Sequence, residues 1–513
     1  MDDLLLLLPE IVLLVFAFII FGLDLFWKGK ANANRAAFPA LALVGSVGAL
    51  AAAFFIWMQA GRGAIQLSVI ATDSGNRIPM LAADQFSLFF KVYASVTIAL
   101  VGLVAADYIK AHTRFQGEFY ALTLLAGLAL MLVSSSTNLV MIFLSFEFLS
   151  ITSYLLTGYL RDDALSVEGA LKYFLYGAVA SGVMLYGFSL VYGATGSVDL
   201  HGIALGLAEA DGSIPDVLVI PAIALIVVGL GFKIALVPFH QWSPEAYQGA
   251  PTPITAFLSV GPKAAGFALM VRVLTIAFPA FAHAAAVNWV VILSGIAMLT
   301  MTFGNVVAIW QKDIKRLFAY SSIAQAGYML IGVVAIAPQY VGAWPAFDGL
   351  SQGLNGLLIY LLAYLFTNLG SFAVIIAVEN KTGSSDIARY AGLIKRSPYM
   401  AIAFFVFLLS LVGIPPTAGF MGKLFVFGAA IKQQMYPLAI VAIINSVISV
   451  YYYFYIVRQM FFGEPEDTSP IAASRPLYAA ITIALVLVFA IAIGADPFIK
   501  WAGSSAHILA AAF

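Results

Sequence analysis

Residues 216–238 read DVLVIPAIALIVVGLGFKIALVP, an apolar run long enough to cross a lipid bilayer as one helix. A membrane helix needs about 20 apolar residues, and similar runs recur along the whole chain. Hydrophobic residues make up 62% of the 513 residues and charged residues only 10%, whereas a soluble domain carries about 25% charged residues. Since a soluble chain of this composition could not cover its surface with polar groups, the sequence predicts an integral membrane protein.

The apolar runs predict an all-α, polytopic fold of about 14 transmembrane helices. The first run begins after an acidic start and lacks the pattern of a cleaved signal peptide, so we expect it to remain in the mature protein. The twelfth is long for one span and contains Pro415-Pro416, so we expect a break there. The predicted spans are 4–26, 37–59, 84–106, 117–135, 138–160, 168–194, 216–238, 253–278, 287–310, 315–337, 354–379, 399–431, 436–462 and 476–498.

Charge and cysteine content exclude several classes of function. The 25 basic and 25 acidic residues give a formal net charge of zero, which argues against a nucleic-acid partner. The chain has no cysteine, so it cannot hold an iron–sulfur cluster through thiolates. It also has no glycine-rich phosphate loop and no metal-ligand cluster, so we expect no cofactor and no metal in this chain.

The distribution of lysine and arginine over the loops predicts the orientation of the chain. The loops that follow odd-numbered spans, with the adjoining span ends, carry 16 basic residues, and the opposite side carries 4. Cytoplasmic loops of membrane proteins are enriched in lysine and arginine, so the side with 16 is predicted to be cytoplasmic. Both termini then lie on the periplasmic side of a bacterial inner membrane, or on the equivalent side of a mitochondrial one. The four residues on the opposite side are Arg62, Arg77, Lys432 and Lys500.

Four charged residues stand out inside predicted spans, where a charge costs about 2.5–3.5 kcal/mol on insertion scales. They are Glu147, Lys233, Lys263 and Lys423, and glycine and proline crowd all three lysines. Structural ion pairs, or lysines that reach an interface, are one interpretation. Proton transfer is the interpretation we favour for the set, because a desolvated lysine can give up its proton and regain it beside a carboxylate, whereas arginine keeps its proton.

Other polar residues in or near the spans have weaker claims to a function. Lys91 and Arg272 lie near span ends, and we expect structural or interfacial roles for both. His240 lies between the spans of Lys233 and Lys263; it is either a proton relay or an ordinary hydrogen-bonding residue. The tyrosine-rich run 451–455 is predicted to serve packing or lipid contact.

Spans seven and twelve each combine a proline break with one buried lysine, and they are five spans apart. This spacing predicts two five-helix repeats, and an odd number of spans inserts the second repeat upside down relative to the first. Interrupted helices at corresponding positions of inverted repeats indicate a transport site. The predicted segments are an N-terminal three-helix segment (1–116), two repeats (117–286 and 287–465) and a C-terminal helix (466–513).

Three motifs resemble the antiporter-like subunits of respiratory complex I. Residues 239–253 read FHQWSPEAYQGAPTP and lead to Gly261-Pro262-Lys263, and residues 312–328 read KDIKRLFAYSSIAQAGY. The run 413–423, GIPPTAGFMGK, resembles the N-type branch, since the M-type carries glutamate where Lys423 stands. The L-type has a long C-terminal lateral helix, whereas we expect this chain to stop after helix fourteen.

The resemblance implies a function and a division of labour among subunits. In the family, the residues corresponding to Glu147 and Lys233 form a coupled pair, Lys263 is central and Lys423 leads to the exit. NADH, FMN, iron–sulfur clusters and quinone belong to partner subunits. The expected neighbours are the M-type subunit, the small membrane subunits and lipids. The expected function is proton translocation in NADH:quinone oxidoreductase; the alternatives are a subunit of a Mrp-type cation/proton antiporter and a purely structural membrane subunit.

Overall fold

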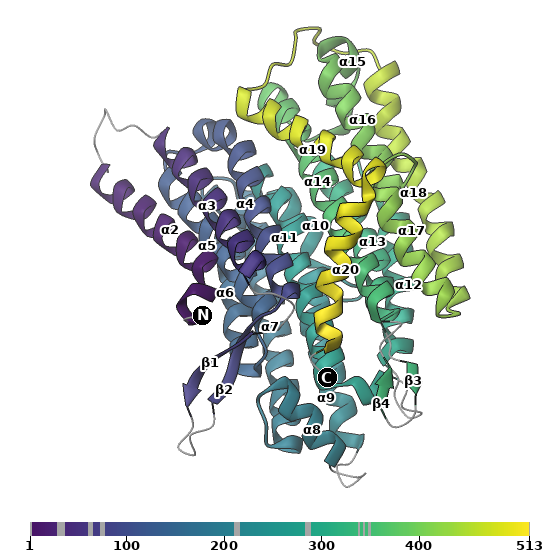
Figure 1. Ribbon diagram of the computed structural model, residues 1–513. Coiled ribbons are helices and arrows are strands. Elements are labelled where there is room, and N and C mark those ends of the chain that lie inside the picture. Colours follow the sequence, from purple (N-terminus) through teal and green to yellow (C-terminus); the bar gives the residue numbers. More distant parts are fainter. Residues whose placement is uncertain are drawn as a thin grey trace.

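The computed structural model describes residues 3–27, 36–59, 65–71, 77–209, 216–282, 289–336, 339–341, 344–346 and 350–511. Within these residues, twelve helices are long and apolar enough to cross a membrane, and two shorter apolar helices occupy predicted spans seven and twelve. Twelve and two give the fourteen predicted spans, so the prediction of a polytopic all-α membrane protein is confirmed. Figure 1 shows these helices side by side.

The helix bounds follow the predicted spans closely. The long helices are α2 Leu8–Trp27, α3 Ala37–Gln59, α4 Gln85–His112, α5 Gln116–Ser135, α6 Leu139–Thr157, α7 Ala164–Thr195, α11 Thr252–Arg272, α12 Trp289–Ala308, α13 Ile314–Val334, α14 Leu350–Thr382, α18 Tyr436–Phe462 and α19 Arg475–Ile493. The shorter or broken helices are α1 Asp3–Leu6, α8 Leu200–Glu209, α9 Asp216–Ile234, α10 Trp242–Gly249, α15 Leu393–Arg396, α16 Pro398–Val412, α17 Ala418–Lys432 and α20 Ala495–Ala511. A π-helix (η1, Val273–Ala277) extends α11, and 3-10 turns occur at η2 (Pro279–Ala282) and η4 (Ile387–Tyr390).

Spans seven and twelve are both interrupted, as the prolines predict. The first breaks between α9 and α10, and the second between α16 and α17. At the second break Gly413 ends α16 with φ of 91°, a left-handed conformation that favours glycine. A Cβ on Gly413 would lie 2.8 Å from Cδ of Lys423, so this glycine also makes room for the lysine stem. The break and the buried lysine are therefore parts of one local structure.

Besides the short helices α8, α10 and α15, two hairpins and a C-terminal helix were not predicted from the sequence. Strands β1 (Ile65–Ala71) and β2 (Arg77–Ala83) form an antiparallel hairpin, and β3 (Gln339–Val341) pairs with β4 (Trp344–Ala346). The expectation that the chain stops after helix fourteen is wrong, because α20 follows α19 after Gly494 and packs against α4 and α14. Figure 1 places both chain ends toward the side of the molecule with the hairpins.

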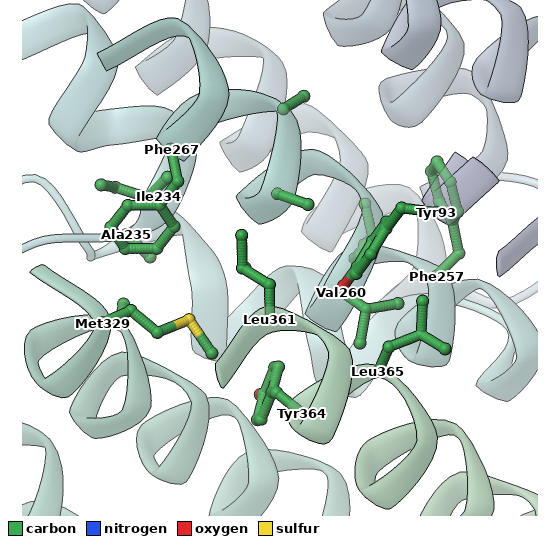
Figure 2. Packing of buried hydrophobic residues seen from close by; sticks show 14 of the residues in the cluster. Tyr93, Ile234, Ala235, Phe257, Val260, Phe267, Met329, Leu361, Tyr364 and Leu365 are labelled. Carbon is green, nitrogen blue, oxygen red and sulfur yellow. The ribbon is translucent and has the colours of Figure 1, made fainter. Parts of the chain in front are cut away.

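Helices α11 and α14 lie deepest in the helix assembly. Every residue in the most apolar stretch of α11 and of α14 is buried, whereas two thirds or more of the corresponding stretches of α2 and α19 are not. Figure 2 shows apolar side chains packed closely in this interior, among them Phe257 and Val260 of α11 and Leu361 and Leu365 of α14. A charged group within these stretches of α11 or α14 therefore cannot reach lipid or bulk water and must find its partners inside the protein.

Candidate functional site

Lys233 lies in the last turn of α9, immediately before the first break. Its side chain is 1% exposed, and its Nζ donates a hydrogen bond to Oγ of Ser150 on α6 over 2.8 Å. The ammonium also lies 5.0 Å from the ring centre of Phe146. A serine hydroxyl can accept from an ammonium and donate to a neutral amine, so this contact suits both protonation states of the lysine.

Glu147 precedes Ser150 by one helical turn on α6. Its Oε1 is buried and has no hydrogen-bond partner within the described structure. The carboxylate forms no direct ion pair with Lys233, although it is close enough to act on the ammonium electrostatically. The structure therefore places the two residues of the expected pair in one neighbourhood, with the Ser150 hydroxyl on the lysine.

His240 lies in the break between α9 and α10. It is 8% exposed, its ring packs edge-to-face against Phe303 at 4.5 Å, and its Nδ1 has no hydrogen-bond partner among the described residues. Within the described structure His240 forms no hydrogen bond with Lys233 or Lys263. Its ring nitrogen Nδ1 is buried and has no hydrogen-bond partner there.

Lys263 lies in the middle of α11, next to Pro262, which removes one backbone donor inside the helix. The lysine is 1% exposed, and its Nζ donates to the backbone oxygen of Ser322 on α13 over 2.7 Å. Lys423 lies in the second turn of α17. Its Nζ donates to the backbone oxygen of Val412 over 2.7 Å and to Oγ of Ser446 over 2.8 Å.

The two breaks hold their lysines differently. Lys233 ends the helix before its break, whereas Lys423 lies in the helix after its break. At both breaks a lysine contacts neutral oxygen acceptors. The lysine belongs to the helix before the first break and to the helix after the second. The predicted boundaries of the two repeats stay a prediction.

Two other buried cations, Lys91 and Arg272, each form an ion pair with a buried carboxylate. Lys91 pairs with Glu10 at 2.8 Å, and Arg272 pairs with Asp84 at 2.6 Å, all four side chains being 7% exposed or less. The expected structural roles of Lys91 and Arg272 are confirmed by these ion pairs. Lys233, Lys263 and Lys423 have no such carboxylate within ion-pair distance in the described structure, so they form a distinct class of buried cation.

Sequence reasoning missed a polar line that joins Lys263 to Lys423. On α13, one turn beyond Ser322, Gln325 donates to the backbone oxygen of Leu411 over 3.1 Å and accepts a hydrogen bond from Tyr360. Leu411 directly precedes Val412, whose backbone oxygen accepts from Lys423. The ring of Tyr328, also on α13, lies 4.6 Å from Nζ of Lys423. One face of α13 thus connects the two lysines.

The tyrosine run of α18 is only partly what the sequence predicted. Tyr451 is 66% exposed, consistent with lipid contact. Tyr452 and Tyr453 are buried, and Tyr452 donates to Asn305 over 2.9 Å while Tyr453 shares a 2.5 Å hydrogen bond with Ser321. These two tyrosines therefore pack inside the protein, as predicted, and they also form hydrogen bonds that the sequence did not indicate.

A fifth buried lysine was counted among loop residues from the sequence. Lys315, in the first turn of α13, is 5% exposed and donates to the backbone oxygen of Ala250 over 2.8 Å. Because Lys315 lies at the end of a predicted span, the sequence did not indicate whether its side chain faces water or the protein interior.

Residues 136–449 match the family described as "NADH:quinone oxidoreductase/Mrp antiporter, TM". The chain belongs to this family. The matched range contains the site glutamate and all three site lysines, so the buried charges lie in the part that defines the NADH:quinone oxidoreductase/Mrp antiporter family.

Individual members of the NADH:quinone oxidoreductase/Mrp antiporter family are similar to this chain over nearly its whole length. The NADH-quinone oxidoreductase subunit N 2 of Symbiobacterium thermophilum is 40% identical, over 98% of this chain and 96% of that protein. A chain of respiratory complex I from Thermus thermophilus is 30% identical, with a TM-score of 0.76 over 96% of this chain and 98% of that chain. A chain of the Mrp complex from Dietzia sp. has a TM-score of 0.82 at 23% identity, over 99% and 98% of the two chains, which shows a shared fold.

Proposed function

We propose that this chain is the N-type, proton-translocating membrane-arm subunit of an NADH:quinone oxidoreductase. One observation carries the proposal: Lys233, Lys263 and Lys423 are buried in the helix interior and contact neutral oxygens instead of carboxylates. A lysine in such a place is costly for stability, which favours a functional role. The similarity to a subunit N over nearly the whole chain points to the same function.

The contacts suggest how the residues work. Neutral oxygen acceptors leave each lysine free to hold or to release its proton, because no carboxylate fixes the charged form. Glu147 lies near Lys233 without a direct contact, so a small movement of α6 or α9 would change the electrostatic interaction between them. Loading and unloading of Lys233 would follow from that movement.

The order of transfer runs from Glu147 and Lys233 through Lys263 to Lys423. The polar face of α13 supports the last step, since it contacts Lys263 through Ser322 and reaches the peptide next to Val412. His240, at the break that follows Lys233, is a possible relay between the first two lysines because a histidine ring can accept and donate a proton near neutral pH.

The energy for pumping would come from partner subunits. In this proposal NADH, FMN, the iron–sulfur clusters and ubiquinone are bound by other chains. The neighbours in the membrane are the M-type antiporter-like subunit, the small membrane subunits and lipids. The chain lies in the bacterial inner membrane, or its mitochondrial equivalent, with both termini on the periplasmic side and the basic loops in the cytoplasm.

A subunit of a Mrp-type cation/proton antiporter is the second candidate, because the fold of a Mrp chain matches over almost the full length. The two candidates differ in their assemblies. Affinity purification of the tagged chain from its native membrane should recover an NADH-oxidising complex. Recovery of an antiporter assembly without NADH oxidation would favour the second candidate.

The function is tested by changing Lys263, the central residue. Arginine keeps the positive charge but holds its proton throughout, so Lys263→Arg should assemble and pump poorly, and Lys263→Ala should pump no better. The measurement is protons pumped per NADH oxidised in reconstituted vesicles, with assembly checked separately. Lys172→Arg, at an exposed ion pair, is the matched control and should pump normally. Normal pumping by assembled Lys263→Arg would rule out the relay role.

A further inference from the structure

Glu379 is a carboxylate near the end of α14 that the sequence analysis did not single out. It lies one turn from the end of the helix, on the side of the basic loops, and it is half-buried. Its Oε2 accepts a short hydrogen bond from Thr252 Oγ1, and its Oε1 accepts from Tyr108 OH at 3.4 Å. Among the described residues no lysine or arginine forms an ion pair with it.

Thr252 is the first residue of α11, the helix that carries Lys263. Thr252, Thr255, Ser259 and Lys263 are spaced by three, four and four residues, so they lie on one face of this helix. The distance from Thr252 to Lys263 along the helix is about 16 Å, at 1.5 Å per residue. Polar groups therefore occur once per turn between the Glu379 contact and the central lysine.

The hydroxyls on this face continue into a wider hydrogen-bonded group. Ser259 accepts from Asn368 of α14 over 2.5 Å, and Asn368 also donates to Tyr364 OH over 3.2 Å. On the other side, Tyr247 OH and Ser322 Oγ are 3.1 Å apart, and the Ser322 backbone oxygen accepts from Lys263. Ser259 donates its own hydroxyl proton to the Ala256 backbone oxygen, so it is held in place as a polar group on this face.

Apolar side chains enclose this polar face. Phe257 and Val260 of α11 and Leu361 and Leu365 of α14 are all buried, and Figure 2 shows Leu361 and Leu365 on either side of Tyr364. We call the polar face of α11, together with Asn368 and Tyr364 of α14, the α11–α14 seam. At its outer end the seam terminates in a half-buried carboxylate, and at its inner end in an unpaired lysine.

We propose that Glu379 is the proton-uptake carboxylate for Lys263 and that the α11–α14 seam carries the proton between them. This inference rests on the proposed function. Glu379 takes a proton from water at the basic end and becomes a carboxylic acid. It then gives the proton to water between the hydroxyls of the seam, which lie about one helical turn apart, and this water passes the proton on by exchanging one O–H bond for another. Lys263 Nζ receives a proton and becomes an ammonium, and Glu379 returns to the carboxylate. No bond other than O–H and N–H changes.

The test compares single and double variants of the whole assembled complex. Glu379→Gln keeps an oxygen that can accept from Thr252 but cannot carry the proton. We expect it to lower the protons pumped per NADH by the same fraction as Lys263→Ala, and we expect the double variant to fall no further, because the two groups act in series. Glu168→Gln removes an exposed carboxylate that is paired with Lys172, and it should pump like the wild type.

The outcomes separate this inference from the proposed function. If Lys263→Ala pumps normally, the proposed function itself fails. If Lys263→Ala is defective but assembled Glu379→Gln pumps normally, only the uptake role of Glu379 is overturned. The same conclusion follows if the double variant pumps less than either single variant. Should Glu379→Gln fail to assemble, Thr252→Val removes the first hydroxyl of the seam. It should show the same loss, and normal pumping by that variant would also overturn the inference.

Discussion

Replacing either of two buried lysines by methionine should change stability in opposite directions. Lys263 and Lys91 are each 1% exposed. Lys91 contacts Glu10 at 2.8 Å, whereas Lys263 donates to a neutral backbone oxygen. Methionine has a similar length and no charge. The substitution therefore removes an uncompensated charge at Lys263, but at Lys91 it leaves a buried carboxylate without its partner.

The expected magnitudes follow from these environments. A lysine inside the bilayer costs about 2.5–3.5 kcal/mol, and a hydrogen bond from a charged group returns about 1.5–3 kcal/mol. Lys263→Met should therefore leave the free energy of unfolding unchanged or raise it by up to about 2 kcal/mol. Breaking one side of a buried ion pair costs about 3–5 kcal/mol, so Lys91→Met should lower the free energy of unfolding by that amount.

The assay is the thermal midpoint of the purified complex in detergent, measured at one scan rate, because large membrane assemblies unfold irreversibly. Proton pumping per NADH is measured on the same preparations. Lys263→Met should keep or raise the midpoint and lose pumping, and Lys91→Met should lower the midpoint. If Lys263→Met lowers the midpoint as far as Lys91→Met, or if it still pumps normally, Lys263 is a structural charge and the reasoning is refuted.

Two further predictions concern orientation and coupling. Because the native chain has no cysteine, a single cysteine introduced at Lys395 should react with an impermeant thiol reagent only from the cytoplasmic side. A single cysteine introduced at Asp211, which lies outside the described residues, should react only from the other side. Reversed labelling would overturn the orientation. Glu147→Gln and Lys233→Met should each reduce coupled pumping, and the double variant should lose less than the sum of the two losses; strictly additive losses would mean that the pair is not coupled.

The breaks and the site lysines could be predicted from the sequence for simple physical reasons. A proline removes a backbone donor and disturbs the helix wherever it stands, so Pro415-Pro416 marked a break without any knowledge of the neighbours. A lysine within an apolar run of 20 residues must be inside the bilayer, so the free-energy cost of its charge could be inferred without knowing its contacts. The same reasoning found Lys233 and Lys263, and it found Glu147.

Only the tertiary structure separated functional from structural charges. Glu10 and Lys91 are 81 positions apart in the sequence, and nothing local indicates that they meet. The inward contacts of Glu379 and Lys315 could not be predicted for a related reason, because a residue at a span end faces either water or the protein, depending on the neighbouring helices.

The faces of the helices were also undetermined by the sequence. In a soluble protein the polar side of a helix identifies its exposed face, but lipid tails are as apolar as a leucine side chain. The interior helix α14 and the peripheral helix α19 are both apolar enough to cross a membrane, although the first is fully buried along its most apolar stretch and the second largely exposed. The apolar runs determined that the chain crosses the membrane and about how often. Which helices enclose the lysines, and which polar groups meet them there, was decided by helix packing alone.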